Sequence, residues 1–464
     1  MSDPTPAAAA NTRRATVLFL LMLIYTSNFV DRTILATLGQ AIKLDLMITD
    51  AQLGLLQGLA FAVFYTAMGI PLARLSERVN RVSLIAVCLT IWSAMTALCG
   101  AAQNFWQLFL CRVGVGIGEA GCTPPAHSLI SDLYPPERRA TALAFYSFGI
   151  PLGVMFGAVA GGWLVEHFNW RVALVAVGLP GVVLALVFRL VAREPVRGAA
   201  DNTIVEHEQA PSIRETAKHL FGNKTFLHIT IGATLVGFVG YGTGTFAYAY
   251  FIRMFDVGYA ELGLGYGLVT GLSAGVGTLL GGWMSDWAGR RDRSWYALLP
   301  GIGLLFATPL YIIAFTRSDW GIALLWLLLP GLFHYAYIGP TLGVMHNLAL
   351  PRMRATATAL FFVVVNLIGL GIGPWVTGAL IDFASARRFS VTGLGDFTAL
   401  CPGGVGLPDA AESLRQACAA STAQGTQDGI VAMMLVFLWA AAHYFIAARH
   451  MGWLRRPAAE ASAS

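Results

Sequence analysis

Long apolar segments separated by short polar ones occupy nearly the whole chain. Each is about 20 residues long, the length that an α-helix needs to cross the hydrocarbon core of a bilayer. The pattern therefore predicts an all-α integral membrane protein with twelve transmembrane helices. We place them near residues 16–38, 52–73, 82–102, 105–131, 140–164, 171–191, 226–252, 260–284, 295–316, 320–346, 356–382 and 428–452.

The composition agrees with a membrane protein. Hydrophobic residues make up 56% of the chain, charged residues only 12%, and the mean hydropathy is +0.65. A water-soluble domain carries about 25% charged residues. The first apolar segment continues past Ala36, which is too long for the hydrophobic region of a cleaved signal sequence. We interpret it as an uncleaved first span.

Positive residues indicate how the chain crosses the membrane. Most of the 30 Lys and Arg residues fall in alternate connections between the predicted spans. Such clusters stay on the cytoplasmic side, so we expect both termini in the cytoplasm and the protein in the inner or plasma membrane. The clusters also explain the net charge of +5 without a nucleic-acid partner. They lie at Arg74, Arg78 and Arg81, at Arg138 and Arg139, in 189–224, at Arg290, Arg291 and Arg293, at Arg352 and Arg354, and at Arg455 and Arg456.

The two halves of the chain repeat each other. AQLGLLQGL at 51–59 matches AELGLGYGL at 260–268, and the register continues to SERVNR at 76–81 and SDWAGR at 285–290. Further along, the halves match at PPERRATA and LPRMRATA, an alignment that pairs Asp132 with Asn347 and Pro125 with Pro340. A parallel repeat of this kind predicts a cavity between the two copies, which rocking exposes to each side of the membrane in turn.

The domain boundaries follow from the spans and the repeat. We expect two pseudo-symmetric bundles of six helices each, joined by a polar linker, with one long outside loop in the second bundle. The parts are a cytoplasmic tail at 1–15, the first bundle at 16–191, the linker at 192–225, the second bundle at 226–452 with its outside loop at 383–427, and a tail at 453–464.

A short motif in two cytoplasmic loops resembles one of the major facilitator superfamily. The second half matches it well, with Trp287 in place of a basic residue, whereas the first half has Ala73 and Asn80 in place of its glycines. The resemblance covers all the predicted spans and implies a gating role for these loops. The matching residues are Glu77, Arg78, Arg81, Gly282, Asp286, Gly289, Arg290 and Arg291.

Longer strings resemble the Spinster-like branch of that superfamily. This resemblance implies transport of amphiphiles, since eukaryotic members are associated with sphingoid phosphates and lysophospholipids. The NxxDR pattern in the first string is also similar to that of organic anion–cation symporters. The strings are NFVDRTIL (28–35), LGLLQGLAFAVFYTAMGIPLARLSERVNR (53–81), RVGVGIGEAGCTPPAHSLISDLYPPERRATA (112–142) and NWRVALVAVGLPG (169–181).

Four charged residues lie within predicted spans of the first half. Asp31 and Arg32 are adjacent in the middle of the first span, where a charge costs about 2.5–3.5 kcal/mol on insertion scales. Arg112 and Glu119 are seven residues apart in the fourth span, hence on one helix face and about 10 Å apart along its axis. Asp31 and Glu119 lie at similar depth, so we expect all four side chains to meet, with Asp31 reaching Arg112 or Glu119.

These four residues suggest proton coupling. A carboxylate shielded from water takes up a proton more readily than an exposed one, and the resemblance implies this role for Asp31 and Glu119, with Arg32 and Arg112 as charge partners. The alternative is a structural ion-pair network that braces the first and fourth helices. A gating salt bridge would combine both roles.

The predicted cavity lining is aromatic and weakly polar. His334 aligns with Glu119 across the repeat and is predicted to face the cavity, where it titrates, binds substrate or only packs. We find no clear intramembrane Lys, Arg, Asp or Glu in the second half, so its wall is largely apolar, and such asymmetry suits an amphiphile. The lining residues are Tyr25, Asn28, Phe29, Tyr146, Tyr241, Tyr248, His334, Tyr335, Tyr337 and Asn366.

The fifth span carries a glycine at every fourth position: Gly149, Gly153, Gly157 and Gly161. A stripe of small residues lets two helices approach closely. It loosely resembles the glycine-rich signature of antiporters but lacks the Gly-Pro pair. We therefore predict close helix packing and draw no conclusion about export.

These features favour a secondary active transporter driven by a proton gradient, without a cofactor or metal. The sequence has no metal-type cluster and no nucleophile elbow, which disfavours a membrane enzyme. It has no Walker motif, which disfavours transport driven by ATP hydrolysis. The repeated halves disfavour a channel or receptor, because they indicate rocking rather than a fixed pore. The alternatives are an organic anion symporter, in which Arg32 and Arg112 bind a carboxylate, and a multidrug-type exporter. The expected partners are the bilayer, an amphiphilic substrate and protons, and the fold needs no second subunit.

Two cysteines lie in the predicted outside loop, Cys401 and Cys418. Disulfides persist on the outer side of a membrane, so we predict a bridge between them, the alternative being two unrelated loop cysteines. The segment 408–420 of this loop is a candidate surface helix. The other four cysteines fall inside apolar spans, where a thiol is usually inert core.

A bridge between Cys401 and Cys418 predicts that a maleimide labels neither thiol in unreduced protein and both after reduction. Peptide mass mapping of labelled full-length protein measures this. Labelling of both residues without reductant would rule out the bridge.

Overall fold

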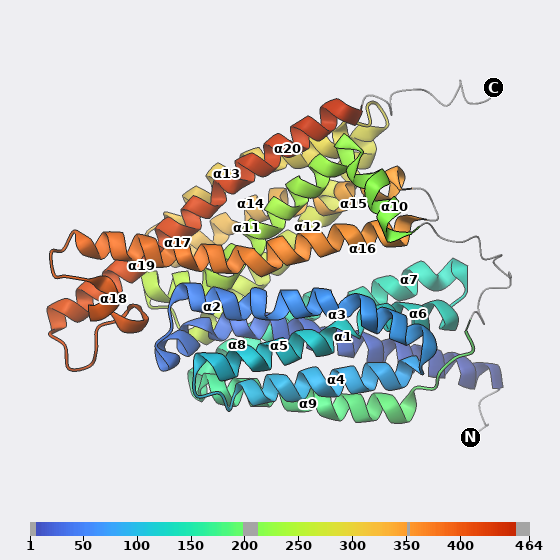
Figure 1. Cartoon of the computed structure of the whole chain (residues 1–464), viewed down its shortest axis with the longest axis horizontal. Coiled ribbons are helices and arrows are strands. Elements are labelled where there is room, and N and C mark those ends of the chain that lie inside the picture. The colour runs from blue at the N-terminus through green and yellow to red at the C-terminus, as the bar shows by residue number, and fades with distance from the viewer. Residues whose placement is uncertain (1–5, 198–211, 350–352, 452–464) are drawn as a thin grey trace. The chain divides into compact units, whose positions relative to one another are not determined.

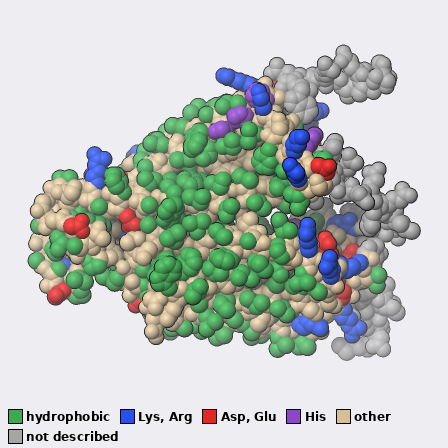
Figure 2. Space-filling view, viewed as in Figure 1, with side chains coloured by type: hydrophobic (Ala, Val, Ile, Leu, Met, Phe, Trp, Pro, Cys, Tyr) green, Lys and Arg blue, Asp and Glu red, His purple; other side chains and the backbone are tan. Residues whose placement is uncertain are grey.

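The computed structural model describes residues 6–197, 212–349 and 353–451, and within these ranges it contains helices and no strand (Figure 1). Eleven helical segments of this part of the chain are long and apolar enough to cross a membrane. Hydrophobic side chains cover most of the visible helix surface (Figure 2), and several are more than two-thirds exposed, including Leu190, Leu279 and Leu325. An exposed apolar surface of this extent is suited to lipid contact.

The chain divides into two compact units, within residues 1–48, 55–206 and 257–267 for the first and 49–54, 207–256 and 268–464 for the second. The helices that begin in the first half of the chain are α1 (Pro6–Leu46), α2 (Asp50–Gln57), α3 (Leu59–Arg78), α4 (Arg81–Cys99), α5 (Phe105–Ala120), α6 (Thr123–Leu133), α7 (Pro136–Ser147), α8 (Gly149–His167) and α9 (Trp170–Val191).

The remaining helices lie in the second half of the chain. They are α10 (Ile213–Phe221), α11 (Lys224–Phe255), α12 (Tyr259–Gly289), α13 (Trp295–Phe315), α14 (Trp320–Tyr335), α15 (Ile338–Leu348), α16 (Arg354–Val364), the π-helix η2 (Val365–Ile372), α17 (Gly373–Ser390), α18 (Phe397–Leu400), the 3₁₀ turn η3 (Pro402–Gly404), α19 (Glu412–Met434) and α20 (Val436–His450).

The fourth predicted span, 105–131, is not one helix. It consists of α5 and α6, which are interrupted at Gly121 and Cys122. Two prolines, Pro124 and Pro125, follow this break in the first turn of α6. Because proline lacks the backbone N–H of a continuing helix but fits a first turn, the chain restarts there. The predicted span at 105–131 thus consists of two helices. Other predicted spans are also divided, as at 140–164, which contains parts of α7 and α8.

The glycines of the fifth span face α1. A Cβ on Gly153 would lie 2.5 Å from both the Cβ of Phe29 and the carbonyl oxygen of Thr26. Gly149 and Gly157 meet the backbone of α1 in the same way one turn before and after. The glycine stripe therefore brings the α8 backbone directly against the helix that carries Asp31 and Arg32.

Two segments related by the repeat begin with their backbone held by an acidic side chain. In the second unit, the N–H groups of Asp50 and Ala51 donate to the carboxylate of Asp382, at 3.0 and 2.8 Å. In the first unit, the N–H of Ala260 donates to Glu166 at 2.7 Å. A carboxylate at a helix N-terminus satisfies free backbone donors and opposes the positive end of the helix dipole. Each unit thus anchors the first turn of a helix that continues in the other.

A buried ion pair holds the same region of the second unit. Arg253 on α11 donates to both carboxylate oxygens of Asp50, at 2.7 and 3.0 Å, and to the hydroxyl of Thr426 at 2.7 Å. The side chains of Arg253 and Asp50 are 4% and 0% exposed. Arg253 follows the last residue of the predicted span 226–252, and α11 continues past it to Phe255. The structure therefore adds a buried ion pair that the sequence analysis does not predict.

The outside loop is more helical than the sequence analysis expects. α17 continues to Ser390 and α19 begins at Glu412, so much of 383–427 is helix. Alanine-rich sequence has a high helix propensity even when its composition is polar. A disulfide joins Cys401 to Cys418, with Cα atoms 5.6 Å apart, and both pack against Phe389. Figure 1 shows α18 and the start of α19 together at one end of this unit.

The linker also contains a helix that the sequence analysis does not predict. α10 begins with a capping box in which the Ser212 hydroxyl accepts from the N–H of Glu215 while the Glu215 carboxylate accepts from the N–H of Ser212. This arrangement satisfies two backbone donors reciprocally.

Substitution of Gly153 by alanine is expected to destabilise the protein. The added methyl group overlaps Phe29 and Thr26, and such overpacking costs about 1–3 kcal/mol. The control is Gly69→Ala on α3, where a Cβ meets nothing within 4 Å and helix propensity favours alanine by about 1 kcal/mol. Thermal unfolding in detergent compares the variants, and equal midpoints would contradict the close α1–α8 contact.

Arg253→Gln is expected to lower the free energy of unfolding by about 3–5 kcal/mol, because it leaves the Asp50 carboxylate buried without its charge partner. Arg388→Gln breaks an ion pair with Asp428 whose side chains are 48% and 38% exposed, and this control is expected to cost less than about 1 kcal/mol. Denaturant titration of the purified protein measures both. Similar losses in the two variants would be inconsistent with a stabilising buried pair.

Candidate functional site

The four charged residues of the first half lie in the first unit, on two helices. Asp31 and Arg32 are on α1, and Arg112 and Glu119 are on α5. We call these four residues the buried charge cluster. Asp31, Arg112 and Glu119 are 1%, 4% and 1% exposed. Burial of this degree for charged groups requires either a partner or a change of protonation.

Arg32 and Glu119 form the direct ion pair of the cluster. The Nε of Arg32 donates to Oε2 of Glu119 at 2.8 Å, and the two side chains are 24% and 0% exposed. The buried side chain of Asn28, one turn before Arg32, also interacts with the Glu119 carboxylate as a hydrogen-bond donor. The Oε1 atom of Glu119 is buried without a hydrogen-bond partner. Glu119 is therefore only partly satisfied by its arginine.

Three aromatic rings surround the guanidinium of Arg32. Its Cζ atom lies 4.8 Å from the ring centroid of Phe61, 4.9 Å from that of Tyr65 and 5.3 Å from that of Phe29. A cation over aromatic faces is attracted by their quadrupoles, by about 2 kcal/mol when water is excluded. This aromatic surround explains how Arg32 remains charged inside an apolar bundle.

The second arginine is placed by the same aromatic residue. Arg112 lies with its Cζ atom 5.4 Å from the Phe61 ring. A Cβ on Gly116 would lie 2.7 Å from the carbonyl oxygen of Phe61, so α5 packs directly on the α3 backbone at this level. The glycine thus brings α5, which carries Arg112, close to the aromatic side chains of α3.

Asp31 forms no ion pair at contact distance. Neither of its buried carboxylate oxygens has a donor in normal hydrogen-bond geometry, and the buried Nε of Arg112 has no acceptor in such geometry. Trp92 and Thr96 on α4 lie near the carboxylate as side-chain donors, and Arg112 and Glu119 act on it through their charges. Buried polar atoms without a partner are rare in proteins and mark positions with a function or an absent water or ion. Asp31 is the least satisfied group of the cluster.

Aromatic side chains extend from the cluster along α1. The rings of Tyr25 and Tyr146 stack with centroids 4.4 Å apart, Phe29 packs edge-on against Tyr25 at 5.2 Å, and His127 packs edge-on against Tyr146 at 5.4 Å. Tyr146 is fully buried, so it supports Tyr25 and does not itself face open space.

The other predicted cavity residues belong to the second unit: Tyr241, Tyr248, His334, Tyr335, Tyr337 and Asn366. His334 is buried, with Nδ1 3.2 Å from the Tyr311 hydroxyl and its ring 4.7 Å from Tyr335 and 4.9 Å from Phe437. These contacts are those of a packed histidine within an aromatic group. Tyr248 is 2% exposed, whereas Tyr241 is 43% exposed.

Asn366 lies in the π-helix η2, a conformation that the sequence analysis does not predict. A π-helical turn inside an α-helix is frequent at functional sites. Close packing holds this one, since a Cβ on Gly373 would lie 2.5 Å from the carbonyl oxygen of Phe238 on α11.

The loop motif of the first half belongs to a network of ion pairs and hydrogen bonds around Arg81. Arg81 is 1% exposed and donates to Asp132, Glu194 and Ser128, each at 2.6 Å. Glu77 and Arg78 of the same motif are exposed. In the second half, Asp286 accepts from the Tyr296 hydroxyl at 2.7 Å, and Arg291 lies 5.3 Å from the Trp287 ring centroid.

Sequence reasoning missed several of these contacts. It did not select Phe61, Tyr65, Trp92 or Glu194, which an apolar segment or a polar linker does not distinguish from ordinary packing residues. The one available signal for Phe61 and Tyr65 is their spacing of four residues, which places two aromatic rings on the same helix face.

Comparison with known proteins agrees with this architecture. Residues 21–374 match the model of the Major Facilitator Superfamily. An MFS-type efflux pump of Mycolicibacterium smegmatis is 34% identical over 366 residues, which cover 78% of this chain and 83% of that protein. Protein spinster homolog 1 of Homo sapiens is 28% identical over 420 residues, 84% of this chain and 76% of that protein.

Two crystal structures of a bacterial homologue of the human lysosomal transporter Spinster are similar in fold. The inward-facing, unoccupied structure has a TM-score of 0.89 at 36% identity and covers 99% of this chain and 100% of that one. The inward-facing, occupied structure has a TM-score of 0.86 at 37% identity and covers 96% and 99%. The predicted family and fold class are confirmed. The chain is thus an integral membrane protein of the Major Facilitator Superfamily, similar to the Spinster homologues within it.

Proposed function

We propose that the protein is a proton-coupled secondary transporter that moves an amphiphilic, lipid-like or organic substrate by alternating access. The observation that supports it best is the buried charge cluster. Asp31 is buried without a hydrogen-bond partner in normal geometry. The neighbouring ion pair between Arg32 and Glu119 leaves one carboxylate oxygen of Glu119 without a partner. A membrane enzyme has no comparable support, because the family and fold are those of transporters.

The cluster has the properties of a proton-binding site. With Asp31 and Glu119 both ionised, two negative charges face two arginines, and a proton on either carboxyl leaves a net positive charge on the cluster. The guanidinium of Arg32 can then separate from Glu119 and stay within the bundle, because the rings of Phe61 and Tyr65 still hold it. Protonation therefore changes which groups hold α1 to α5, and this change is the coupling step that we propose.

Alternating access is supported by two helical segments, Thr49–Gly54 and 257–267, each of which is held in one unit while the chain after it belongs to the other. We call these two segments the exchanged helix starts. Thr49–Gly54 is anchored in the second unit but is continuous with α3 of the first, and 257–267 shows the reverse arrangement. Any rocking of one unit against the other must break the Asp382 and Glu166 contacts or bend the chain between anchor and helix. Gly58, at the α2–α3 junction, lies outside helical geometry, with φ −98° and ψ −92°, and provides such a bend.

The amphiphilic substrate is supported by the distribution of charge and aromatic groups. The first unit offers arginines and carboxylates, whereas the predicted lining of the second unit is tyrosine, histidine and asparagine. The solved relatives are homologues of a lysosomal transporter, and one curated relative is an efflux pump. Export is accordingly the alternative direction, and an organic anion bound at Arg112 the alternative substrate.

We further propose that the protein acts in the inner or plasma membrane with both termini in the cytoplasm, as a monomer. The arginine clusters of the loops support the orientation. The monomer rests on the expectation that this fold needs no second subunit.

Asp31→Asn and Glu119→Gln are expected to reduce proton-driven uptake at least 10-fold, roughly 1.4 kcal/mol or more of lost coupling. The assay is uptake of a fluorescent lysophospholipid into proteoliposomes under an imposed pH gradient. Asp45→Asn is the control, since Asp45 is an exposed acid on the same helix, paired with Arg171 at the surface.

Substrate exchange without a gradient separates coupling from folding and binding. Both cluster variants are expected to retain it, because the substrate still exchanges when no proton has to move. Full gradient-driven uptake by Asp31→Asn and Glu119→Gln would overturn the proton role. A folded wild type without uptake would instead redirect the substrate to small organic anions.

A further inference from the structure

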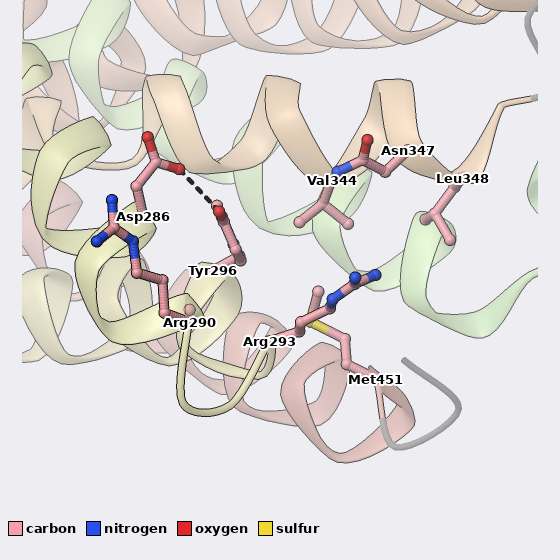
Figure 3. Close-up of a pocket in the computed structure, with 9 residues that line it drawn as sticks. Asp286, Arg290, Arg293, Tyr296, Val344, Asn347, Leu348 and Met451 are labelled. Atoms are coloured by element: carbon pink, nitrogen blue, oxygen red, sulfur yellow. Dashed lines mark hydrogen bonds between the residues drawn. The ribbon is translucent and has the colours of Figure 1, made fainter. Parts of the chain in front are cut away.

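A basic pocket lies on the second unit, outside the buried charge cluster. It encloses about 540 Å³ between the end of α12, the start of α13, α15 and the end of α20. Figure 3 shows Arg290, Arg293 and Asn347 around it, with the Asp286–Tyr296 hydrogen bond at one side. A volume of this size is within the range of small-molecule sites. The pocket is lined by Asp286, Gly289, Arg290, Arg293, Tyr296, Val344, Asn347, Leu348 and Met451.

The repeat shows what occupies the corresponding place in the first unit. The alignment of 76–81 with 285–290 pairs Arg81 with Arg290. Arg81 is fully enclosed by its partners, because Ser128, Asp132 and Glu194 all accept from its guanidinium at 2.6 Å. Two carboxylates thus neutralise this arginine, which is 1% exposed.

Two of these partners are lost in the second unit. The alignment pairs Asp132 with Asn347 and, at the same offset, Ser128 with Gly343. A Cβ on Gly343 would meet nothing within 4 Å. One carboxylate is thus replaced by an amide, and the hydroxyl by open space.

The side chains that line the pocket carry more positive than negative charge. Among the described residues, no ion pair involves Arg290 or Arg293. The one carboxylate of the pocket, Asp286, accepts from the Tyr296 hydroxyl. Two guanidiniums and one carboxylate leave a net positive site with the amide of Asn347 beside it.

We propose that this pocket binds a phosphate group, which takes the place of the carboxylates found around Arg81. The guanidiniums of Arg290 and Arg293 match phosphate oxygens in charge and hydrogen-bond geometry, and the Asn347 amide supplies a neutral donor. The phosphate is that of an anionic phospholipid in the cytoplasmic leaflet. This site is separate from the transport pathway proposed above.

The surface of α12 indicates the lipid source. Leu272, Val276, Leu279 and Trp283 share one helix face and are 59%, 36%, 76% and 65% exposed. The face continues to Trp287, which is 56% exposed, and ends at the arginines. Tryptophan gathers at the level of lipid headgroups, and basic pockets between helices on the cytoplasmic side bind anionic headgroups. An acyl chain along this face brings its phosphate to the pocket.

The test is native mass spectrometry of the full-length protein in detergent, titrated with phosphatidylglycerol or phosphatidylcholine. Wild type is expected to retain phosphatidylglycerol selectively. Arg290→Gln with Arg293→Gln is expected to weaken this retention about 10- to 30-fold, since each arginine near a membrane surface contributes about a fivefold effect. Arg214→Gln with Lys218→Gln on α10 removes the same charge outside the pocket and is expected to change retention less than about threefold.

Asn347→Asp is the more specific variant, because it restores the carboxylate that the first unit has at this place. It is expected to fold, to raise the thermal unfolding midpoint of lipid-free protein, and to lose phosphatidylglycerol as the double arginine variant does. A parallel titration with inorganic phosphate distinguishes the sources. Displacement of the lipid at millimolar phosphate would keep the phosphate site but assign it to a soluble ligand.

Two results would overturn the proposal. One is wild-type retention of phosphatidylglycerol by both pocket variants. The other is an equal loss in the α10 control, which would show that the lipid responds to total charge and not to this pocket.

Discussion

The structure of the first unit depends on how an apolar helix bundle accommodates two adjacent charged residues of α1, Asp31 and Arg32. Asp31 and Arg32 point in different directions from α1, so a single partner helix cannot satisfy both. Glu119 on α5 takes Arg32, and the rings of Phe61, Tyr65 and Phe29 enclose its guanidinium. Glycines make this possible, because α8 lies directly on α1 and α5 on α3. Removal of either glycine contact would move the charges away from their partners.

The two halves show how one scaffold acquires different chemistry. In the first half, buried charge lies in the middle of the bundle and Arg81 is neutralised at its end. In the second half, the position related to Glu119 is His334, which packs among Tyr335, Phe437 and Tyr311. The arginine related to Arg81 has an amide in place of one carboxylate. The unsatisfied charge therefore lies at the centre of the first bundle and at the end of the second.

The exchanged helix starts link this scaffold to movement. Asp382 and Glu166 hold the first turns of repeat-related helices by backbone donors, which any sequence in those turns would supply. The Arg253–Asp50 ion pair lies in the second unit beside the Asp382 contact, and both of its side chains are buried. Since a buried pair contributes little net stability but is costly to break in half, it suits a contact that forms and opens as a unit.

The sequence by itself determined the membrane class, the family, the repeated halves and the placement of four charges on two helices, because hydropathy and spacing are local properties. It also predicted the close packing of the glycine stripe, since small residues at every fourth position have one physical use. Only the tertiary structure decided that Arg32 and not Arg112 bonds Glu119, that Asp31 has no hydrogen bond in normal geometry, and that Arg253 is buried. It alone showed the helical outer segment, the break at Gly121 and the open pocket at Arg290. These depend on which helices meet and on the side chains of distant residues, and no local pattern records that.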